Sequence, residues 1–192
     1  GIKAAKNELL LFTDADCHAE TDKWAEGMVS HFNENTDFVL GYGGYEVRKG
    51  ILNRYIRYDT MMIALQYTGM ALRGIPYMGV GRNLAYRRSV FFKNKGFGSH
   101  SNIVSGDDDL FVNQLANKQN TAVEIRRETH TRSVPASSFT ELFNQKRRHL
   151  TTANHYKLRD RIILFTEPVT RTLFYISFVI LISWSYLWQY TA

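Results

Sequence analysis

The sequence is poor in the residues that cross-link or break a chain. It contains one cysteine, Cys17, and three prolines among 192 residues. A single thiol excludes an internal disulfide, so the fold does not depend on an oxidising compartment. We interpret Cys17 as a small residue packed beside a strand end rather than as a catalytic thiol. Internal repeats are also lacking, and 44% of the residues are hydrophobic, which excludes a disordered tail.

Charge is absent from the end of the chain. No charged side chain occurs from Thr172 to Ala192, and a bilayer core needs about 20 predominantly apolar residues in a helix. We therefore predict a transmembrane helix over 172–192, with a buried core helix as the alternative. Residues 151–171 are predicted to form a juxtamembrane segment, in which Pro168 ends a short interfacial helix.

Acidic residues are outnumbered, with 24 Lys plus Arg against 18 Asp plus Glu and a formal charge of +6. Most of the excess lies in 145–161, just before the apolar stretch. This position favours a membrane surface over nucleic acid, so membrane lipids are expected partners and nucleic acid is not. The positive-inside tendency predicts an inner or plasma membrane location with the preceding domain in the cytoplasm.

Strands that alternate with helices predict an α/β layered fold for residues 1–150. The first strand is a short buried run, which suggests a parallel strand covered on both faces. Trp24, Met28 and Phe32 follow helical spacing and predict a core-facing stripe. The expected strands are 9–13, 38–40 and 121–125, the expected helices are 21–32, 52–72, 108–117 and 138–150, and 83–92 forms a strand or short helix after a loop at 76–81.

Two carboxylates, Asp14 and Asp16, follow the first strand one residue apart. Ligands in open α/β sheets bind beyond the carboxyl ends of strands. Mg²⁺ and Mn²⁺ prefer oxygen ligands and bridge to substrate phosphates. The pair therefore predicts a site for a divalent cation, although a solvated turn or a helix cap also uses Asp.

Three adjacent acids, Asp107, Asp108 and Asp109, open a predicted helix. Their mutual repulsion raises the pKa of at least one of them. A carboxylate with a raised pKa beside a cleft is a candidate general base. The alternative is an acidic first turn that the helix dipole stabilises.

Two further segments combine basic side chains with amide groups. On a helix, Gln145, Arg148 and His149 share one face, where Arg clamps phosphate oxygens and Gln orients a hydroxyl. The alternative for this motif is a basic anchor beside a membrane, which is also how we interpret Lys146 and Arg147. The segment 79–88 combines glycines with an amide and guanidinium groups, and it allows a backbone to approach a sugar or diphosphate closely.

Taken in their order along the chain, the four segments resemble the family 2 glycosyltransferases of the GT-A fold, especially their membrane-bound synthase-like branch. That family carries a DxD, an acceptor loop, an ED-type motif and QxxRW before a transmembrane helix. The resemblance spans nearly the whole chain. His149 stands where the family usually has Trp. The family's first strands and its uridine-binding acid would precede Gly1, so the chain resembles an N-terminally truncated catalytic domain and is expected to be inactive alone.

The resemblance implies a metal-dependent, inverting hexosyltransferase that moves a sugar from a nucleotide-diphosphate donor, expected to be a UDP-sugar, to a hydroxyl of a glycan or lipid acceptor. Asp108 would be the general base and Asp107 the next candidate, while Asp109 stays open. The other implied site residues are Asp14 and Asp16 for Mg²⁺ or Mn²⁺ and the donor diphosphate, Gln145 and Arg148 for the diphosphate, and Gly81, Arg82, Asn83 and His149 for the acceptor.

Two other function classes remain open. A membrane-anchored scaffold that binds anionic lipid would explain residues 145–192 but leaves the clustered acids without a role. A metal-dependent nucleotidyltransferase or phosphotransferase also uses paired carboxylates, and it would release pyrophosphate where a sugar transferase releases a nucleoside diphosphate.

Overall fold

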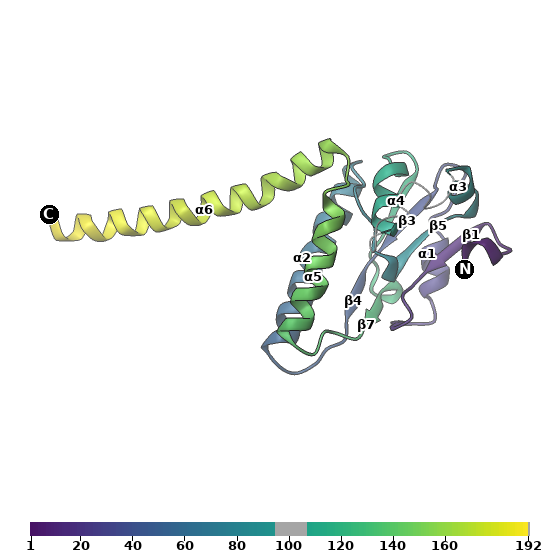
Figure 1. Cartoon of the computed structure of the whole chain (residues 1–192), viewed down its shortest axis with the longest axis horizontal. Coiled ribbons are helices and arrows are strands. Elements are labelled where there is room, and N and C mark those ends of the chain that lie inside the picture. Colours follow the sequence, from purple (N-terminus) through teal and green to yellow (C-terminus); the bar gives the residue numbers. More distant parts are fainter. Residues whose placement is uncertain (95–106, 192) are drawn as a thin grey trace. The chain divides into compact units, whose positions relative to one another are not determined.

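The computed structural model describes residues 1–94 and 107–191, with the side chains of all of these except 107, 149, 150 and 185–191. Contacts divide the chain into two units, Gly1–Tyr156 and Lys157–Ala192. The first unit is a mixed α/β domain, as the sequence predicts, and the second is a single long helix (Figure 1).

A four-stranded mixed sheet forms the centre of the first unit. Across the sheet its strands are β1 (Leu9–Phe12), β5 (Leu84–Arg87), β3 (Phe38–Gly41) and β6 (Thr121–Glu124). Strand β5 is antiparallel to both neighbours, whereas β3 and β6 are parallel. The prediction that β1 is a parallel strand is therefore wrong, because it pairs antiparallel with β5. A run of apolar residues indicates that both faces of a strand are covered, but it does not determine whether the strand pairs parallel or antiparallel with its neighbour.

A second, three-stranded sheet lies beside the first. Its strands are β2 (Cys17–Ala19), β7 (Thr131–Ser133) and β4 (Gly43–Tyr45), in that order. Strand β7 is antiparallel to β2 and parallel to β4. Only Tyr42 separates β3 from β4, so this glycine-rich stretch carries the chain directly from one sheet into the other.

The helices of the first unit largely follow the sequence pattern. The α-helices are α1 (Trp24–Val29), α2 (Ile51–Leu72), α3 (Arg88–Lys93), α4 (Asp107–Leu115) and α5 (Phe139–Ala153), and the short 3-10 helices are η1 (Ile2–Ala4), η2 (Gly81–Asn83) and η4 (Arg127–Thr129). Ser138 caps α5, because its side chain accepts a hydrogen bond from the Glu141 backbone N–H. Helix α1 is shorter than predicted at both ends.

Two apolar clusters fix the helices on the sheets. Met28 is fully buried against β3 and β5, and Trp24 and Phe32 pack around it, which confirms the predicted stripe. In the second cluster, Tyr45, Ile56 and Leu142 bring β4, α2 and α5 together, with Leu52 and Ala136 packed against them. Helices α2 and α5 consequently lie side by side (Figure 1).

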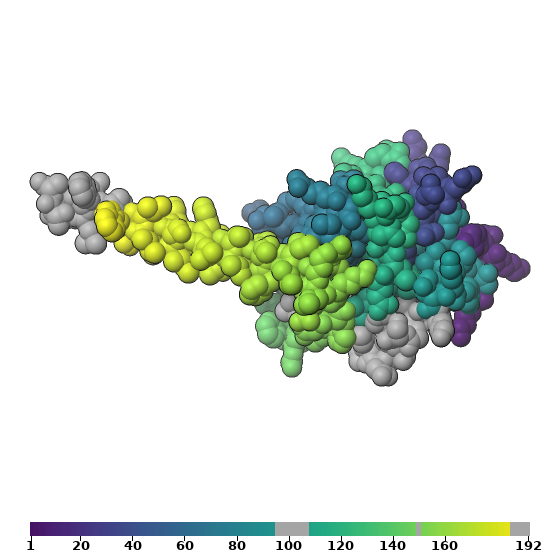
Figure 2. Space-filling view, turned by 90° about the horizontal axis from the view of Figure 1, so that it is seen from above, coloured from purple at the N-terminus to yellow at the C-terminus, as the bar shows by residue number. Residues whose placement is uncertain are grey.

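The second unit consists of α6 (Leu158–Thr191), a continuous helix of 34 residues. Within the described part of the chain, Leu158–Trp184 is long and apolar enough to cross a membrane, by length and composition alone, and none of its apolar window is buried. Most of its described side chains, coloured yellow-green to yellow, are exposed on the face that Figure 2 shows.

The predicted break at Pro168 is wrong, because this proline lies inside α6. A proline in a helix removes one backbone hydrogen bond, but the other bonds can carry the helix past it. Two side-chain contacts bridge this turn. The Thr172 hydroxyl donates to the Pro168 carbonyl at 2.7 Å, and Arg171 pairs with Glu167 one turn away at 3.4 Å.

Glu124 is a buried acid at the end of β6, with 2% of its surface exposed. It accepts hydrogen bonds from Arg126 Nε at 2.8 Å, from the Arg126 backbone N–H at 2.7 Å and from His31 Nε2 at 2.9 Å. Burial alone raises the pKa of Glu124, but the bonds from Arg126 and His31 outweigh it and hold the pKa at about 2.

We expect Glu124→Gln to lower the free energy of unfolding at pH 7 by roughly 3 kcal/mol, because it leaves a buried charge network incomplete. The folded pKa, about 2, lies below the usual 4.5. The stability that Glu124 contributes is therefore present above pH 4.5 and is lost as the pH falls towards 2. Denaturant unfolding in mild detergent, measured from pH 7 to pH 2, should show the unfolding free energies of the unmodified chain and of Glu124→Gln converging as the pH falls.

The matched control is Glu128→Gln, because Glu128 faces the same Arg126 at 3.7 Å but is 46% exposed. It should change the unfolding free energy by no more than about 0.5 kcal/mol. Equal losses in both variants would contradict the role given to Glu124.

Candidate active site

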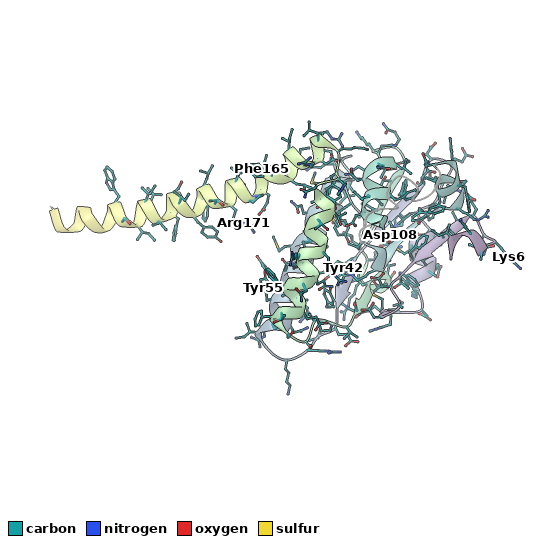
Figure 3. The ribbon with its side chains drawn as sticks, viewed as in Figure 1. Lys6, Tyr42, Tyr55, Asp108, Phe165 and Arg171 are labelled. Carbon is teal, nitrogen blue, oxygen red and sulfur yellow. The ribbon has the colours of Figure 1, made fainter. Side chains whose placement is uncertain are left out.

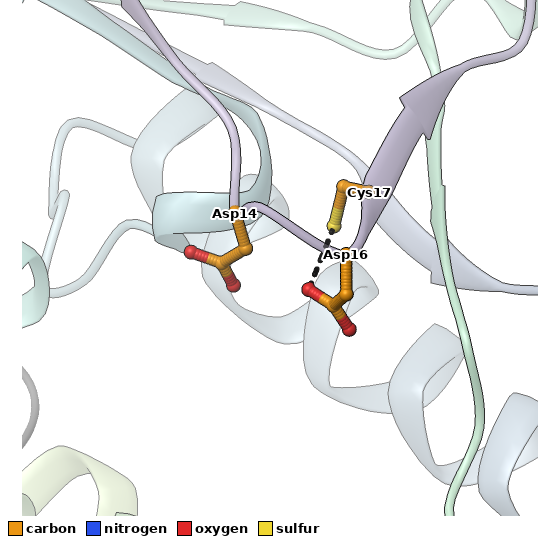
Figure 4. Close-up of side chains that lie close together, drawn as sticks. All are labelled: Asp14, Asp16 and Cys17. Carbon is orange, nitrogen blue, oxygen red and sulfur yellow. Dashed lines mark hydrogen bonds between the residues drawn. The ribbon is translucent and has the colours of Figure 1, made fainter.

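The two carboxylates predicted to hold a metal lie on one tight turn directly after β1. The backbone N–H of Cys17 donates to the Asp14 carbonyl at 3.0 Å and closes the turn. One oxygen of Asp14, one oxygen of Asp16 and the Cys17 sulfur lie within 4.8 Å of one another (Figure 4). This spacing suits side chains that share one ion.

The second sheet holds one of these carboxylates in place. Ser133 Oγ on β7 donates to Asp16 Oδ2 at 2.6 Å. Burial raises the pKa of Asp14, the Arg82 charge lowers it, and the neighbouring Asp16 raises it again. Two neighbouring carboxylates that repel each other are stabilised by a divalent cation, so the donor set fits Mg²⁺ or Mn²⁺.

Cys17 lies beside this pair, but its thiol is poorly suited to bind a hard cation. Burial and the charges of Asp16 and Asp14 raise the pKa of its thiol, although hydrogen bonds with Ser133 and Thr13 lower it in part. The thiolate is the form that binds metals and attacks substrates, and Mg²⁺ and Mn²⁺ prefer oxygen. These observations agree with the sequence interpretation that Cys17 is no catalytic thiol.

A glycine brings the acidic helix start to the same place. A Cβ atom added at Gly81 would collide with Asp108 Oδ2 and would lie 3.5 Å from Asp14 Oδ1. The Asp108 and Asp14 carboxylates therefore both face the bare backbone of Gly81, from α4 and from the turn after β1 (Asp108 is labelled in Figure 3). Three segments that are far apart in sequence meet at this point.

Arg82 connects this junction to Gln145 on α5 through Tyr45. Its guanidinium lies 4.5 Å from the centre of the Tyr45 ring, and the Tyr45 hydroxyl accepts a hydrogen bond from Gln145 Nε2 at 3.0 Å. The Nη1 atom of Arg82 is buried and has no hydrogen-bond partner among the described residues. Tyr45 was not predicted from the sequence, because it follows a glycine run and belongs to no motif.

The three adjacent acids separate in the structure. Asp108 faces Gly81, whereas Asp109 is enclosed and accepts a hydrogen bond from Tyr156. Burial first, and the Asp108 charge second, raise the pKa of Asp109 to about 7, against the lowering effects of Arg82 and Tyr156. The expectation that one acid of the cluster has a raised pKa is thus met at Asp109. The side chain of Asp107 lies outside the described residues.

The side chain of Asn83 is held inside the fold by hydrogen bonds. It is fully buried. Its oxygen accepts from Trp24 Nε1 at 2.9 Å, and its nitrogen donates to the carbonyls of Tyr42 and Thr129 at 2.9 and 2.8 Å. Its predicted contact with an acceptor remains a prediction, and these bonds occupy the groups that such a contact would need.

The α5 motif is only partly drawn into the site. Gln145 reaches Tyr45, but the Arg148 side chain is exposed and makes no hydrogen bond or ion pair with the described residues. Lys146 forms an ion pair with Asp59 on α2, which the interpretation as a membrane-surface charge did not anticipate. The His149 side chain lies outside the described residues, so its predicted role is untested.

Comparison with known proteins identifies the fold. No family model matches the chain, and no curated protein matches its sequence significantly. Among solved structures, it is similar to a mannosyltransferase from Pyrobaculum calidifontis in complex with GDP-mannose and Mn²⁺, with a TM-score of 0.53 and 14% identity. The match covers 80% of this chain and 38% of that protein. The chain thus has the α/β fold of a glycosyltransferase and corresponds to well under half of that mannosyltransferase's length.

We expect Gly81→Ala to weaken Mn²⁺ binding about tenfold or more, because its Cβ would displace the Asp108 carboxylate and crowd Asp14. The electron paramagnetic resonance signal of free Mn²⁺ measures this affinity. Gly69→Ala on α2 is the control, since a Cβ there meets nothing within 4 Å. Unchanged Mn²⁺ affinity in a folded Gly81→Ala protein would contradict the shared junction.

Proposed function

We propose that the chain is part of the catalytic domain of a metal-dependent glycosyltransferase that moves a sugar from a nucleotide-diphosphate donor to an acceptor hydroxyl. The observation that carries this proposal is the meeting of Asp14 and Asp108 at the bare backbone of Gly81. The fold is shared with a mannosyltransferase whose structure holds GDP-mannose and Mn²⁺, which supports the same chemistry. A lipid-binding scaffold would leave this acidic junction without a purpose.

Asp14 and Asp16 are the proposed ligands of Mg²⁺ or Mn²⁺. When bound, the ion neutralises charge that builds up on the diphosphate leaving group. Arg82 adds a guanidinium whose buried Nη1 has no partner in the described part of the chain, and a diphosphate oxygen would satisfy it. Gln145 supports Arg82 through Tyr45, and we keep the exposed Arg148 as a further contact to the diphosphate.

Asp108 is the proposed general base. Its carboxylate faces Gly81, where the absence of a side chain lets a substrate hydroxyl come close to the backbone. Proton transfer to Asp108 lets the hydroxyl attack the sugar carbon from the side opposite the diphosphate, which inverts the anomeric centre. Asp107 stays the second candidate.

The acceptor is proposed to contact Gly81, Arg82 and His149. We assign Asn83 a positioning role, because its three hydrogen bonds hold the turn that presents Gly81 and Arg82. An imidazole at position 149 can stack on a sugar, although its surface is smaller than that of an indole.

The wider architecture is also a proposal. We assign residues 1–150 to the C-terminal part of a family 2 catalytic domain, 151–171 to the membrane interface and 172–192 to the membrane. The length and composition of α6 support this assignment, as does the basic segment before it. The acceptor would then be a glycan or lipid at the cytoplasmic membrane face.

The proposal predicts metal-dependent binding of a nucleoside diphosphate. Calorimetric titration of GDP and UDP with Mn²⁺ should show saturable binding, because both nucleotides carry the diphosphate that the ion would hold. Asp16→Asn should weaken this binding by about tenfold or more, because it removes one charged ligand. Asp22→Asn, which changes an exposed acid six residues further along the sequence, should leave it intact.

Binding that Asp16→Asn leaves unchanged, or no binding of either nucleotide, would contradict the proposal and favour the scaffold. Where turnover is measurable, the released product separates the remaining classes. A sugar transferase releases a nucleoside diphosphate, whereas pyrophosphate would indicate a nucleotidyltransferase.

A further inference from the structure

The two faces of the three-stranded sheet are in contact with different side chains. A Cβ added at Gly43 would lie 2.8 Å from the Arg82 Cβ, whereas one added at the next residue, Gly44, would lie 2.6 Å from Arg132 Nη1. Successive residues of a strand point to opposite faces. One face of the sheet therefore carries Arg82 and the proposed donor site, and the other carries Arg132.

The face with Arg132 borders a cavity of about 510 Å³. This volume lies within the range of about 300–1,000 Å³ that is usual for small-molecule sites. Five basic and imidazole side chains, from β2, from α2 and from the stretch 127–132, contribute to its wall. They are His18, Arg57, Arg127, His130 and Arg132.

Two glutamates in the wall, Glu20 and Glu46, already have partners. Arg132 Nε lies 2.5 Å from Glu20 Oε2, and Arg48 Nη2 lies 3.0 Å from Glu46 Oε2. The Arg132 side chain is also fixed by its fit over Gly44. Each glutamate of the wall is thus paired with one arginine. The two remaining arginines of the wall have no glutamate of the wall as a partner.

Those two are Arg57 on α2 and Arg127 on η4. Among the described residues, no carboxylate lies within ion-pair distance of either guanidinium. Two guanidiniums without counter-charges on one cavity wall create a positive potential inside it. Guanidinium groups bind phosphate oxygens through paired hydrogen bonds, so the charge left over suits one phosphate dianion.

His130 adds an independent observation. Its Nε2 lies 3.0 Å from the Ile125 carbonyl oxygen, and because a carbonyl only accepts, Nε2 must carry the proton. The other ring nitrogen, Nδ1, is buried and has no hydrogen-bond partner in the described part of the chain. Buried polar atoms almost always have a hydrogen-bond partner, so we infer that a ligand atom supplies the partner of Nδ1. A hydroxyl or a protonated phosphate oxygen would supply the hydrogen that a neutral ring accepts.

We propose that this cavity binds the phosphate group of a ligand other than the sugar donor, with Arg57 and Arg127 as its principal contacts. The site needs no metal, because its charge is supplied by guanidinium groups. The phosphate belongs either to a small phosphorylated molecule or to a lipid headgroup. The proposal does not depend on the glycosyltransferase assignment, since none of its residues belongs to the proposed donor site.

The test is a calorimetric titration of the whole chain with inorganic phosphate in the absence of divalent metal. We expect saturable binding of one phosphate per chain. Arg57→Gln and Arg127→Gln should each weaken it by about tenfold, the usual effect of losing a charge-assisted contact. Arg54→Gln, one turn earlier on α2 and exposed, should leave it unchanged, as should Asp16→Asn in the donor site.

A second titration identifies the source of the phosphate. A short-chain, water-soluble phosphatidic acid that binds more tightly than inorganic phosphate, with the same dependence on Arg57 and Arg127, assigns the site to a lipid headgroup. Equal or weaker binding assigns it to a small molecule. The proposal is overturned if the chain shows no saturable phosphate binding, or if folded Arg127→Gln protein binds phosphate as well as the unmodified chain does.

Discussion

The contact on which the unit depends is the approach of two carboxylates, Asp14 and Asp108, to the backbone of Gly81. Like charges at such a place repel, so the surrounding structure has to hold them there. Arg82 lowers the pKa of Asp14 from one side, and Ser133 holds the neighbouring Asp16 from another. Asn83 ties the turn that contains Gly81 to Trp24, to Tyr42 and to Thr129. One buried amide thereby connects α1, the link between the two sheets and η4.

This constraint explains why the second sheet matters although it is small. Each of its strands places a neighbour of the junction: Asp16 precedes β2, Ser133 ends β7 and Tyr45 ends β4. Tyr45 in turn receives Gln145 from α5. The alternation of side chains along these strands gives the sheet two chemically different faces. One face carries the acidic junction, and the other carries the basic cavity that we assign to a phosphate.

Features that are local in sequence were predictable, and features that depend on pairing were not. The stripe of Trp24, Met28 and Phe32 and the position of Asp14 and Asp16 directly after a strand follow from spacing within a few residues. The direction of β1 depends on its partner Leu84–Arg87, which its own residues do not reveal. Pro168 was expected to break a helix that its neighbours maintain. The separation of Asp108 from Asp109 is set by what α4 packs against.

The central claim is that Asp14, Asp16, Gly81 and Asp108 form one centre around a divalent ion. Paramagnetic broadening of amide signals by bound Mn²⁺ tests it most directly, because the effect reports proximity to the ion without requiring turnover. We predict that the amide signals of residues 14–17, 81 and 108 broaden first, and that those of Asn35 and Gln119, which precede β3 and β6 at the opposite end of the central sheet, persist to higher Mn²⁺ concentrations. Broadening confined to residues 14–17, with the signals of Gly81 and Asp108 unaffected, would contradict it.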